Sequence, residues 1–197
     1  ITLQKRISDT LASLTGTPVA DALKYLQCGI EKEGLRLSNE GRIAATDHPK
    51  VLGSTLTHGN ITTDYSEALQ EFITPVYNNP ESAIAHMQQL HTFNAQALAA
   101  QDEYLWPGSM PCYLASEDDI RIAEYGSSNT GKLKHIYRVG LAYRYGKIMQ
   151  CIAGIHYNFS MPEEFWQQAW EKAGRPASLK DFQTQGYLDL IRNFFER

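Results

Sequence analysis

The sequence predicts an α+β domain in which helices flank an antiparallel sheet. One observation is a helical repeat of apolar residues from Ile84 to Leu98, which opens at Asn79-Pro80-Glu81 with a helix cap, a proline and an acid. The other is a set of segments with the alternation or the composition of strands: Gly29–Leu37, Leu69–Thr74 and Lys147–Met161. At 197 residues the chain can bury a core as one large domain or two small ones.

Composition excludes several classes of function. The net charge of −4 provides no basic surface for nucleic acid, and the apolar runs are too short to span a membrane. The first residues lack the apolar core of a secretory signal. The odd number of scattered cysteines favours a reducing compartment, so we expect a cytoplasmic protein. Cys28, Cys112 and Cys151 are too scattered for a disulfide framework or a zinc site, and we expect them to be reduced and buried.

Further helices, strands and loops are predicted along the first half of the chain. Leu3, Ile7, Leu11 and Leu14 have helical spacing, and a short helical run follows over Val19–Tyr25. After the first strand, the turn sequence Asn39-Glu40-Gly41 favours a hairpin with Arg42–Ala45 as its return strand. A polar loop, Asp47–Asn60, comes next.

The segment Ile61–Pro75 is ambiguous, since Asp64, Glu67 and Glu71 also fit one helix face. We predict a strand for Leu69–Thr74 because apolar, aromatic and β-branched residues precede a proline there.

A glycine–serine loop at Tyr125–Lys132 opens another predicted helix. Such a loop can hold an anion, or it can be an ordinary helix entry. Two helices close the chain: a run after Pro162 that ends at Gly174, and a run over Leu179–Phe195 that Gly186 interrupts.

Glu31 and Glu33 are separated by one residue, so a strand places both on one face with Leu35 and Leu37. Two carboxylates about 7 Å apart repel each other unless a cation lies between them. A divalent cation would favour the pair, and a solvated edge strand with mixed charges is the alternative.

Two more strands carry polar groups of the same kind. Glu71 shares a predicted face with Leu69 and Ile73, where a carboxylate needs a partner. On the last strand, Gln150, His156 and Asn158 alternate with a uniformly apolar face and predict the wall of a polar pocket; a lone histidine would more often lie in a core. Carboxylates with one imidazole suit Mg²⁺ or Mn²⁺ better than zinc, and their number suggests more than one ion.

Six segments in this order resemble motifs of the proteobacterial glutamate–cysteine ligases, over about Gly29 to Phe165. They are Gly-Ile-Glu-Lys-Glu-Gly-Leu-Arg, Leu-Gly-Ser-Thr-Leu-Thr-His, Ile-Thr-Thr-Asp-Tyr-Ser-Glu-Ala-Leu-Gln-Glu-Phe-Ile-Thr-Pro-Val, Trp-Pro-Gly-Ser-Met-Pro-Cys-Tyr, Tyr-Gly-Ser-Ser-Asn-Thr-Gly-Lys and Gly-Ile-His-Tyr-Asn-Phe-Ser. The resemblance implies a curved antiparallel sheet of the glutamine synthetase-like type with flanking helices. Members are longer, so residues 1–197 would be a single N-terminal portion of the catalytic domain, truncated before the part that completes it.

The resemblance also implies a reaction. The γ-carboxylate of L-glutamate would be joined to the amine of L-cysteine through a γ-glutamyl phosphate, with ATP as co-substrate and Mg²⁺ as cofactor, in the first step of glutathione biosynthesis. The C-terminal part of the family's chain would be a partner of this one. The open alternatives are a non-catalytic fragment that binds metal or amino acids, and a ligase that uses another amine.

Site residues follow from the resemblance position by position. Glu31, Glu33, Asp64, Glu71 and His156 match the metal ligands. Arg138 matches the catalytic contact to an anionic substrate group, for which a guanidinium is suited. The residues that match the cysteine pocket are Tyr137, Leu141 and Gln150. Asn158 is added from its strand face, and Glu67 has no clear role in the match.

Overall fold

The computed structural model describes residues 5, 8–9, 12–13 and 15–196. Leu3, Ile7, Leu11 and Leu14, on which the first predicted helix depends, lie outside the described residues. The chain divides into two compact units. The larger is Cys28–Asn158, and the smaller combines Ile1–Gln27 with Phe159–Arg197.

The larger unit is built on a five-stranded sheet. Its strands are β1 (Gln27–Ser38), β2 (Ile61–Thr63), β3 (Leu69–Ile73), β4 (Glu103–Leu105) and β5 (Ile155–Ser160). The order is β2-β3-β1-β4, and β5 also pairs with β1. The pairs β1–β3, β1–β4 and β2–β3 are antiparallel. The predicted α+β class with an antiparallel sheet and flanking helices is therefore confirmed.

β1 is paired along both edges. Toward β3, the amide of Arg36 donates to the carbonyl of Ala68 over 2.8 Å. On the opposite edge the carbonyl of Leu35 accepts from Trp106 over 2.7 Å, and the amide of Glu33 donates to Gly154 over 2.9 Å. Because backbone groups of alternate residues point to alternate edges, β4 and β5 share this second edge of β1.

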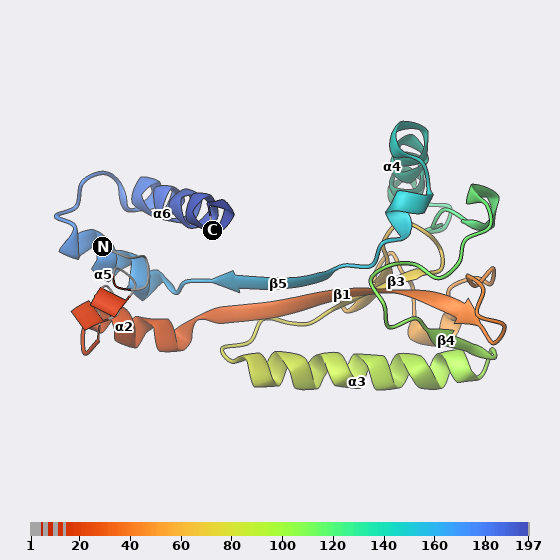
Figure 1. The fold of residues 1–197 in the computed structure, drawn as a ribbon, viewed down its shortest axis with the longest axis horizontal. Coiled ribbons are helices and arrows are strands. Elements are labelled where there is room, and N and C mark those ends of the chain that lie inside the picture. The colour runs from red at the N-terminus through yellow and green to blue at the C-terminus, as the bar shows by residue number, and fades with distance from the viewer. Residues whose placement is uncertain (1–4, 6–7, 10–11, 14, 197) are drawn as a thin grey trace. The chain divides into compact units, whose positions relative to one another are not determined.

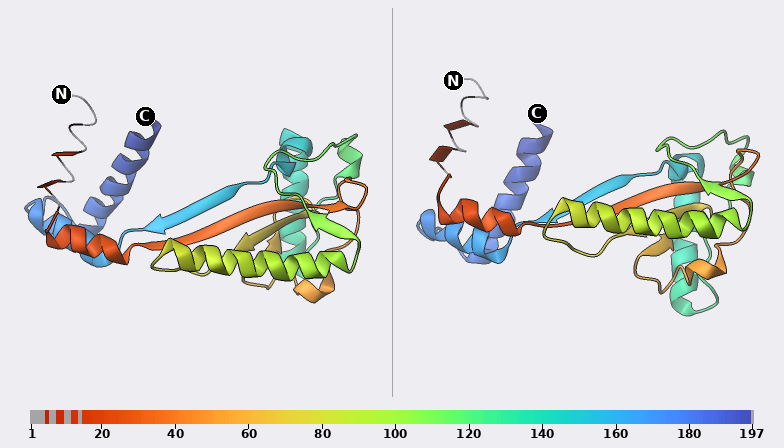
Figure 2. Two further views of the ribbon diagram at one scale, coloured as in Figure 1. Left: turned by 60° about the horizontal axis from the view of Figure 1, so that its bottom comes forward. Right: turned by 90° about the horizontal axis from the view of Figure 1, so that it is seen from below.

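The two faces of the sheet bury different cores. The long helix α3 (Pro80–Ala99) lies along one face (Figures 1 and 2). There Met87 and Ala97 contribute to a core with Phe72 and Ile61. The opposite core contains the odd-numbered β1 residues and part of α4 (Asn129–Tyr145): Leu35, Leu37, Tyr65, Ala68, Leu69, Cys151, Ala153 and Leu141. The predicted alternation of β1 is confirmed.

The predicted strand Lys147–Met161 is wrong in its first half. The chain instead forms the 3-10 helix η4 (Ile148–Cys151), and β5 begins only at Ile155. The amide of Ala153 donates to the carbonyl of Ser109 over 2.8 Å, so this stretch finds its hydrogen bonds in a loop and not in the sheet. Gln150 therefore does not lie on a strand face with His156.

Other short elements also differ from expectation. Arg42–Ala45 contributes only an isolated bridge, between Ile43 and Leu37, and is not a full return strand. β2 and β4 are too short for an alternating pattern to predict them. The remaining 3-10 helices are η1 (Leu23–Tyr25), η2 (Lys50–Leu52) and η3 (Glu117–Asp119).

A buried ion pair joins β1 to β4. Arg36 has no exposed surface, and its Nη1 donates to Glu103 over 2.7 Å. The same guanidinium donates to Thr46 Oγ1 over 2.7 Å, to the Thr46 carbonyl over 2.8 Å and to the Glu67 carbonyl over 3.2 Å. Because these partners come from distant segments, Arg36 connects two strands and two loops.

The smaller unit is helical. It contains α2 (Pro18–Ala22), α5 (Glu163–Lys172) and α6 (Leu179–Phe195). The Trp166 ring lies 4.9 Å from the ring of Tyr187 and 6.4 Å from that of Phe182, measured between centroids. Gly186 does not interrupt α6. A Cβ at this position would lie 2.5 Å from the Trp166 ring, so the glycine permits close packing of the helix.

Two composition-based predictions concern the whole described chain. Cys28, Cys112 and Cys151 are buried and unpaired, as predicted. Within the described residues, every helix is too short or too polar to cross a membrane.

We predict that Glu103→Gln lowers the free energy of unfolding by about 3 kcal/mol, because it leaves the Arg36 charge buried without its carboxylate. Urea unfolding at pH 7 measures the effect. The control is Asp47→Asn, which removes the exposed partner of Arg121 and should leave the urea midpoint nearly unchanged. Equal midpoints for both variants would show that the buried pair contributes little.

Candidate active site

The odd-numbered face of β1 changes from apolar to acidic along the strand. Leu35 and Leu37 are fully buried, whereas Glu31 and Glu33 are half-buried beyond the end of that core. Glu71 of β3 is the direct cross-strand partner of Glu33. Directly opposed residues of an antiparallel pair project on the same side, so these two carboxylates share one face of the sheet.

Asp64 comes to the same region from the end of β2. Its amide donates to the carbonyl of Leu69 over 2.9 Å, which continues the β2–β3 pairing by one residue. The carboxylate is half-buried, and burial raises its pKa, while Arg138 and His156 act in the opposite direction. Its negative charge in turn raises the pKa of both Glu33 and Glu71.

β5 brings neutral and basic partners to the acidic residues. Nδ1 of His156 lies 3.2 Å from a carboxylate oxygen of Glu31, and the side-chain amide of Asn158 donates to the other oxygen over 3.1 Å. The amide of Gly154 donates to Glu33 over 2.7 Å. A Cβ at Gly154 would lie 3.0 Å from Nε2 of His156, so the glycine leaves room for this ring.

We call Glu31, Glu33, Asp64, Glu71 and His156 the acidic cluster. The structure brings all five predicted metal-site residues together from β1, β3, β5 and the end of β2. Asn158, added from its strand face alone, joins the cluster through Glu31.

The cluster carries more negative charge than its surroundings balance. Burial is the largest cause of the raised pKa values of Glu33 and Glu71, and the neighbouring carboxylates raise both further. For Glu71 the pKa rises to about 6. The His156 charge opposes these shifts but does not cancel them.

The donor types of the cluster fit Mg²⁺ or Mn²⁺, since four carboxylates and one imidazole form a mainly hard-oxygen set with excess negative charge. As the side chains stand, no group of three acids, histidines or cysteines in the described part of the chain can hold an ion. Glu31 is bonded to β5 side chains, and Glu33 to the Gly154 amide. Binding an ion therefore requires side chains of the cluster to rearrange.

Arg138 of α4 lies beside the acidic cluster. Its Nε donates to the backbone carbonyl of Asp64, and its Nη1 donates to the carbonyl of Lys134 over 3.0 Å. The guanidinium carbon lies 4.7 Å from the centroid of the Tyr125 ring. The predicted catalytic residue is thus held next to the predicted metal ligands.

The residues predicted for a cysteine pocket lie on two different elements. Tyr137 and Leu141 are one turn apart on α4 and so share a helix face. Tyr137 is 63% exposed, whereas Leu141 packs against the core beneath β1. Gln150 is half-buried on η4. Their role in substrate binding stays a prediction.

Two residues have structural roles that the sequence pattern did not show. Tyr125, which appeared only as the first residue of a loop motif, supports Arg138. Glu67 is buried, and its carboxylate accepts the amides of His48 and Glu124, each over 2.9 Å. No spacing rule could find either one, because their partners are distant in the chain.

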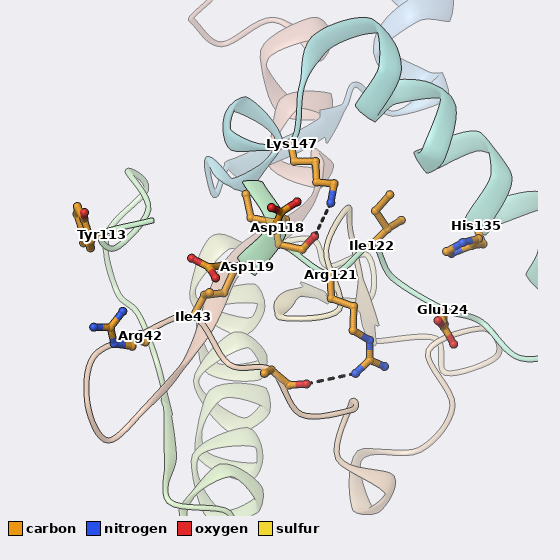
Figure 3. Close-up of a pocket in the computed structure, with 12 residues that line it drawn as sticks. Arg42, Ile43, Tyr113, Asp118, Asp119, Arg121, Ile122, Glu124, His135 and Lys147 are labelled. Carbon is orange, nitrogen blue, oxygen red and sulfur yellow. Dashed lines mark hydrogen bonds between the residues drawn. The ribbon is translucent and has the colours of Figure 1, made fainter. Parts of the chain in front are cut away.

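A cavity of about 650 Å³ is lined by none of the residues of the acidic cluster; Figure 3 shows the side chains that line it. Two of its cationic side chains, Arg121 and Lys147, are already bonded to nearby loops. Arg121 donates to the carbonyl of Ala45, and Lys147 donates to the carbonyl of Ile120 (Figure 3). Outside the residues drawn there, Arg121 also donates to Asp47 over 2.6 Å, and Lys147 donates to the carbonyl of Glu117. The cavity is therefore best described as a junction of loops.

We predict that Glu71→Gln stabilises the protein at pH 7.5 by about 1 kcal/mol, after allowance for the exposed half of the side chain. The folded pKa of about 6 lies above the ordinary 4.5, so folding stability falls as pH rises through this window. The gain should vanish below pH 4.5. Urea unfolding across pH 4–8 measures it, with the exposed Glu40→Gln as control. A gain independent of pH would contradict the raised pKa.

Comparisons with known proteins identify relatives of the chain in sequence. The sequence profile of the family "Glutamate-cysteine ligase" matches residues 11–197. A glutamate–cysteine ligase of Pseudomonas putida is 56% identical over 172 residues, which cover 87% of this chain and 32% of the relative. One from Hahella chejuensis is 54% identical over 173 residues, covering 88% and 33%. The chain thus spans about a third of the length of these relatives.

Two solved structures resemble the fold. A glutamate–cysteine ligase of Francisella tularensis, determined in complex with AMP, is 40% identical with a TM-score of 0.79, covering 87% of this chain and 33% of that one. A bifunctional glutathione synthetase from Pasteurella multocida is 31% identical with a TM-score of 0.79, covering 90% and 22%. Sequence profile, relatives and fold therefore agree with the resemblance seen in the motifs: the chain belongs to the glutamate–cysteine ligase family.

Proposed function

We propose that the chain supplies one wall of the active site of an ATP- and Mg²⁺-dependent ligase. The enzyme joins the γ-carboxylate of glutamate to the amine of cysteine through γ-glutamyl phosphate, the first step of glutathione biosynthesis. One observation supports this most: acids from β1, β3 and the end of β2 share a half-buried surface, where burial and repulsion raise their pKa values. Such excess negative charge suits a site for cations.

Glu31, Glu33, Asp64, Glu71 and His156 would hold the ions, and we expect more than one because a single ion does not use this many ligands. When bound, Mg²⁺ neutralises triphosphate charge and the charge that develops during phosphoryl transfer. The AMP named with the Francisella tularensis structure supports a nucleotide substrate for the family.

Arg138 has the role of binding an anionic group of the substrates. Its guanidinium already lies beside Asp64, and its charge is permanent. A phosphate or carboxylate oxygen pair can accept two parallel hydrogen bonds from it. Such a contact orients the glutamate γ-carboxylate and the ATP γ-phosphate and stabilises the charge on the transferred group.

Cysteine binding is proposed for Tyr137, Leu141 and Gln150. Leu141 contributes an apolar wall, since it packs against the core. Tyr137 is exposed and free to close over a small substrate. Asn158 can donate to substrate oxygens if Glu31 turns toward a bound ion.

The remaining two-thirds of the family's length would complete this wall. We therefore propose that residues beyond this portion, as a partner of the sheet, complete the metal and nucleotide contacts. A ligase that consumes ATP and a free thiol acts in a reducing, ATP-containing compartment, so we propose the cytoplasm. The three unpaired cysteines agree with this location.

We predict that Glu31→Gln and Glu71→Gln each lower Mg²⁺-dependent phosphate release by roughly 100-fold or more in the protein at the full length of its family. The reason is the loss of a charged ligand from the cluster. Release from ATP in the presence of glutamate and cysteine measures the effect, and Glu40→Gln, an exposed turn residue, is the control. Near-normal turnover by both variants would refute the metal assignment.

A second measurement separates binding from catalysis in the 197-residue chain. We expect Mg²⁺ or Mn²⁺ to raise its thermal midpoint at pH 7.5, and Glu71→Gln to abolish the rise, because ions relieve the carboxylate repulsion. Phosphate release without the rest of the protein would show that this portion is sufficient. Binding without release would assign it to a non-catalytic part that needs its C-terminal partner. Phosphate release with another amine, but not with cysteine, would identify a different ligase.

A further inference from the structure

We propose that Tyr125 is a positioning residue that holds the Arg138 guanidinium beside Asp64 for an anionic phosphate or carboxylate group. This inference rests on the anion-binding role proposed above for Arg138. Tyr125 precedes the helix α4 that carries Arg138, and it lies outside the set of residues assigned to metal or substrates. It acts through Arg138, and it does not belong to the acidic cluster.

The hydroxyl of Tyr125 anchors the residue to the end of β2. It donates to the carbonyl of Thr63 over 2.8 Å and lies 3.1 Å from the carbonyl of Asp64. Only 5% of Tyr125 is exposed, so these bonds are shielded from water. The ring is therefore fixed relative to the strand end that presents Asp64.

The ring of Tyr125 supports two cations from the first turns of α4. The Arg138 guanidinium carbon and the Lys134 ammonium each lie 4.7 Å from its centroid. The negative face of an aromatic ring attracts cations, and more strongly where water is excluded. Without the ring the two like charges, one helical turn apart, would repel each other and Arg138 would lose its support.

Tyr125 and Arg138 also meet at one backbone group. The Nε of Arg138 donates to the carbonyl of Asp64, and the hydroxyl of Tyr125, which donates its single proton mainly to Thr63, lies 3.1 Å from the same oxygen. The three groups thus contact one another: the Tyr125 ring lies against the guanidinium, and both residues approach the carbonyl of Asp64. This set determines the direction of Arg138 more firmly than the single bond to the Lys134 carbonyl could.

The charge of Arg138 stays available in this arrangement. Its hydrogen-bond acceptors are backbone carbonyls, and the ion pairs found among the described residues do not include it. A guanidinium that is oriented but not neutralised is suited to an incoming anion. A purely structural arginine would more often be paired, as Arg36 is with Glu103.

The test uses the protein at the full length of its family, with kcat and KM for ATP and glutamate measured separately. We expect Tyr125→Leu to lower kcat/KM by roughly 10- to 100-fold, the loss typical of a misplaced catalytic group. Tyr125→Phe keeps the ring and should recover most of that loss. The matched control is Tyr145→Leu, which removes an exposed tyrosine of α4 whose ring centroid lies 5.8 Å from the guanidinium carbon of Arg144.

A double-mutant cycle separates the two proposals. If Tyr125 acts through Arg138, adding Tyr125→Leu to Arg138→Ala causes no further loss. Normal activity of Arg138→Ala would overturn the proposed function of Arg138 itself. An impaired Arg138→Ala together with a normal Tyr125→Leu, or with fully additive losses, would overturn the positioning role alone.

NMR spectroscopy tests the contact between Tyr125 and Arg138 directly, even if Tyr125→Leu folds poorly. In the 197-residue chain, the Nε–H resonance of Arg138 should be shifted upfield by the Tyr125 ring and retained in Tyr125→Phe. An Arg138 resonance without ring shift in the folded wild-type protein would refute the contact.

Discussion

The pairing of β1 along both edges is the constraint on which the rest of the larger unit depends. β3 occupies one edge, and β4 and β5 share the other, so the strand can neither rotate nor slip without breaking three sets of hydrogen bonds. A slip of one residue would exchange the faces of every side chain. Glu31 and Glu33 would then point into the core beneath α3, where an unpaired carboxylate is far too costly.

The register of β1 places carboxylates next to one another, and no neighbouring residue fully offsets their repulsion. Leu35 and Leu69 lie opposite each other within the core, and two residues away along the same strands Glu33 lies opposite Glu71. The apolar pairs hold the acidic pair in register. In the proposed site, the preorganised carboxylates would therefore come at some expense in stability, as is common in functional sites.

Charged groups are paired at one place in the larger unit and left without a balancing charge at another. Arg36 and Glu103 neutralise each other, and both Nη atoms of the guanidinium donate to nearby oxygens. In the acidic cluster, by contrast, hydrogen bonds from Gly154 and Asn158 satisfy individual oxygens without removing net charge. Negative charge therefore remains uncompensated in the acidic cluster, where a cation could neutralise it, but not around Arg36.

The sequence by itself determined the faces of β1 and the extent of α3, because alternation and helix caps are local signals that the residues themselves carry. Strand alternation also singled out most of the acidic cluster, whereas Asp64 was found through the family resemblance. Only the tertiary structure decided the path of Lys147–Gly154, the two short strands and the support of Arg138 by Tyr125. In each of these the hydrogen-bond partner or packing surface lies far away in the chain. Gln150 illustrates why local patterns are insufficient. It alternates with His156 in the sequence, but the amide of Ala153 donates to the carbonyl of Ser109, so the segment that carries Gln150 does not join the sheet.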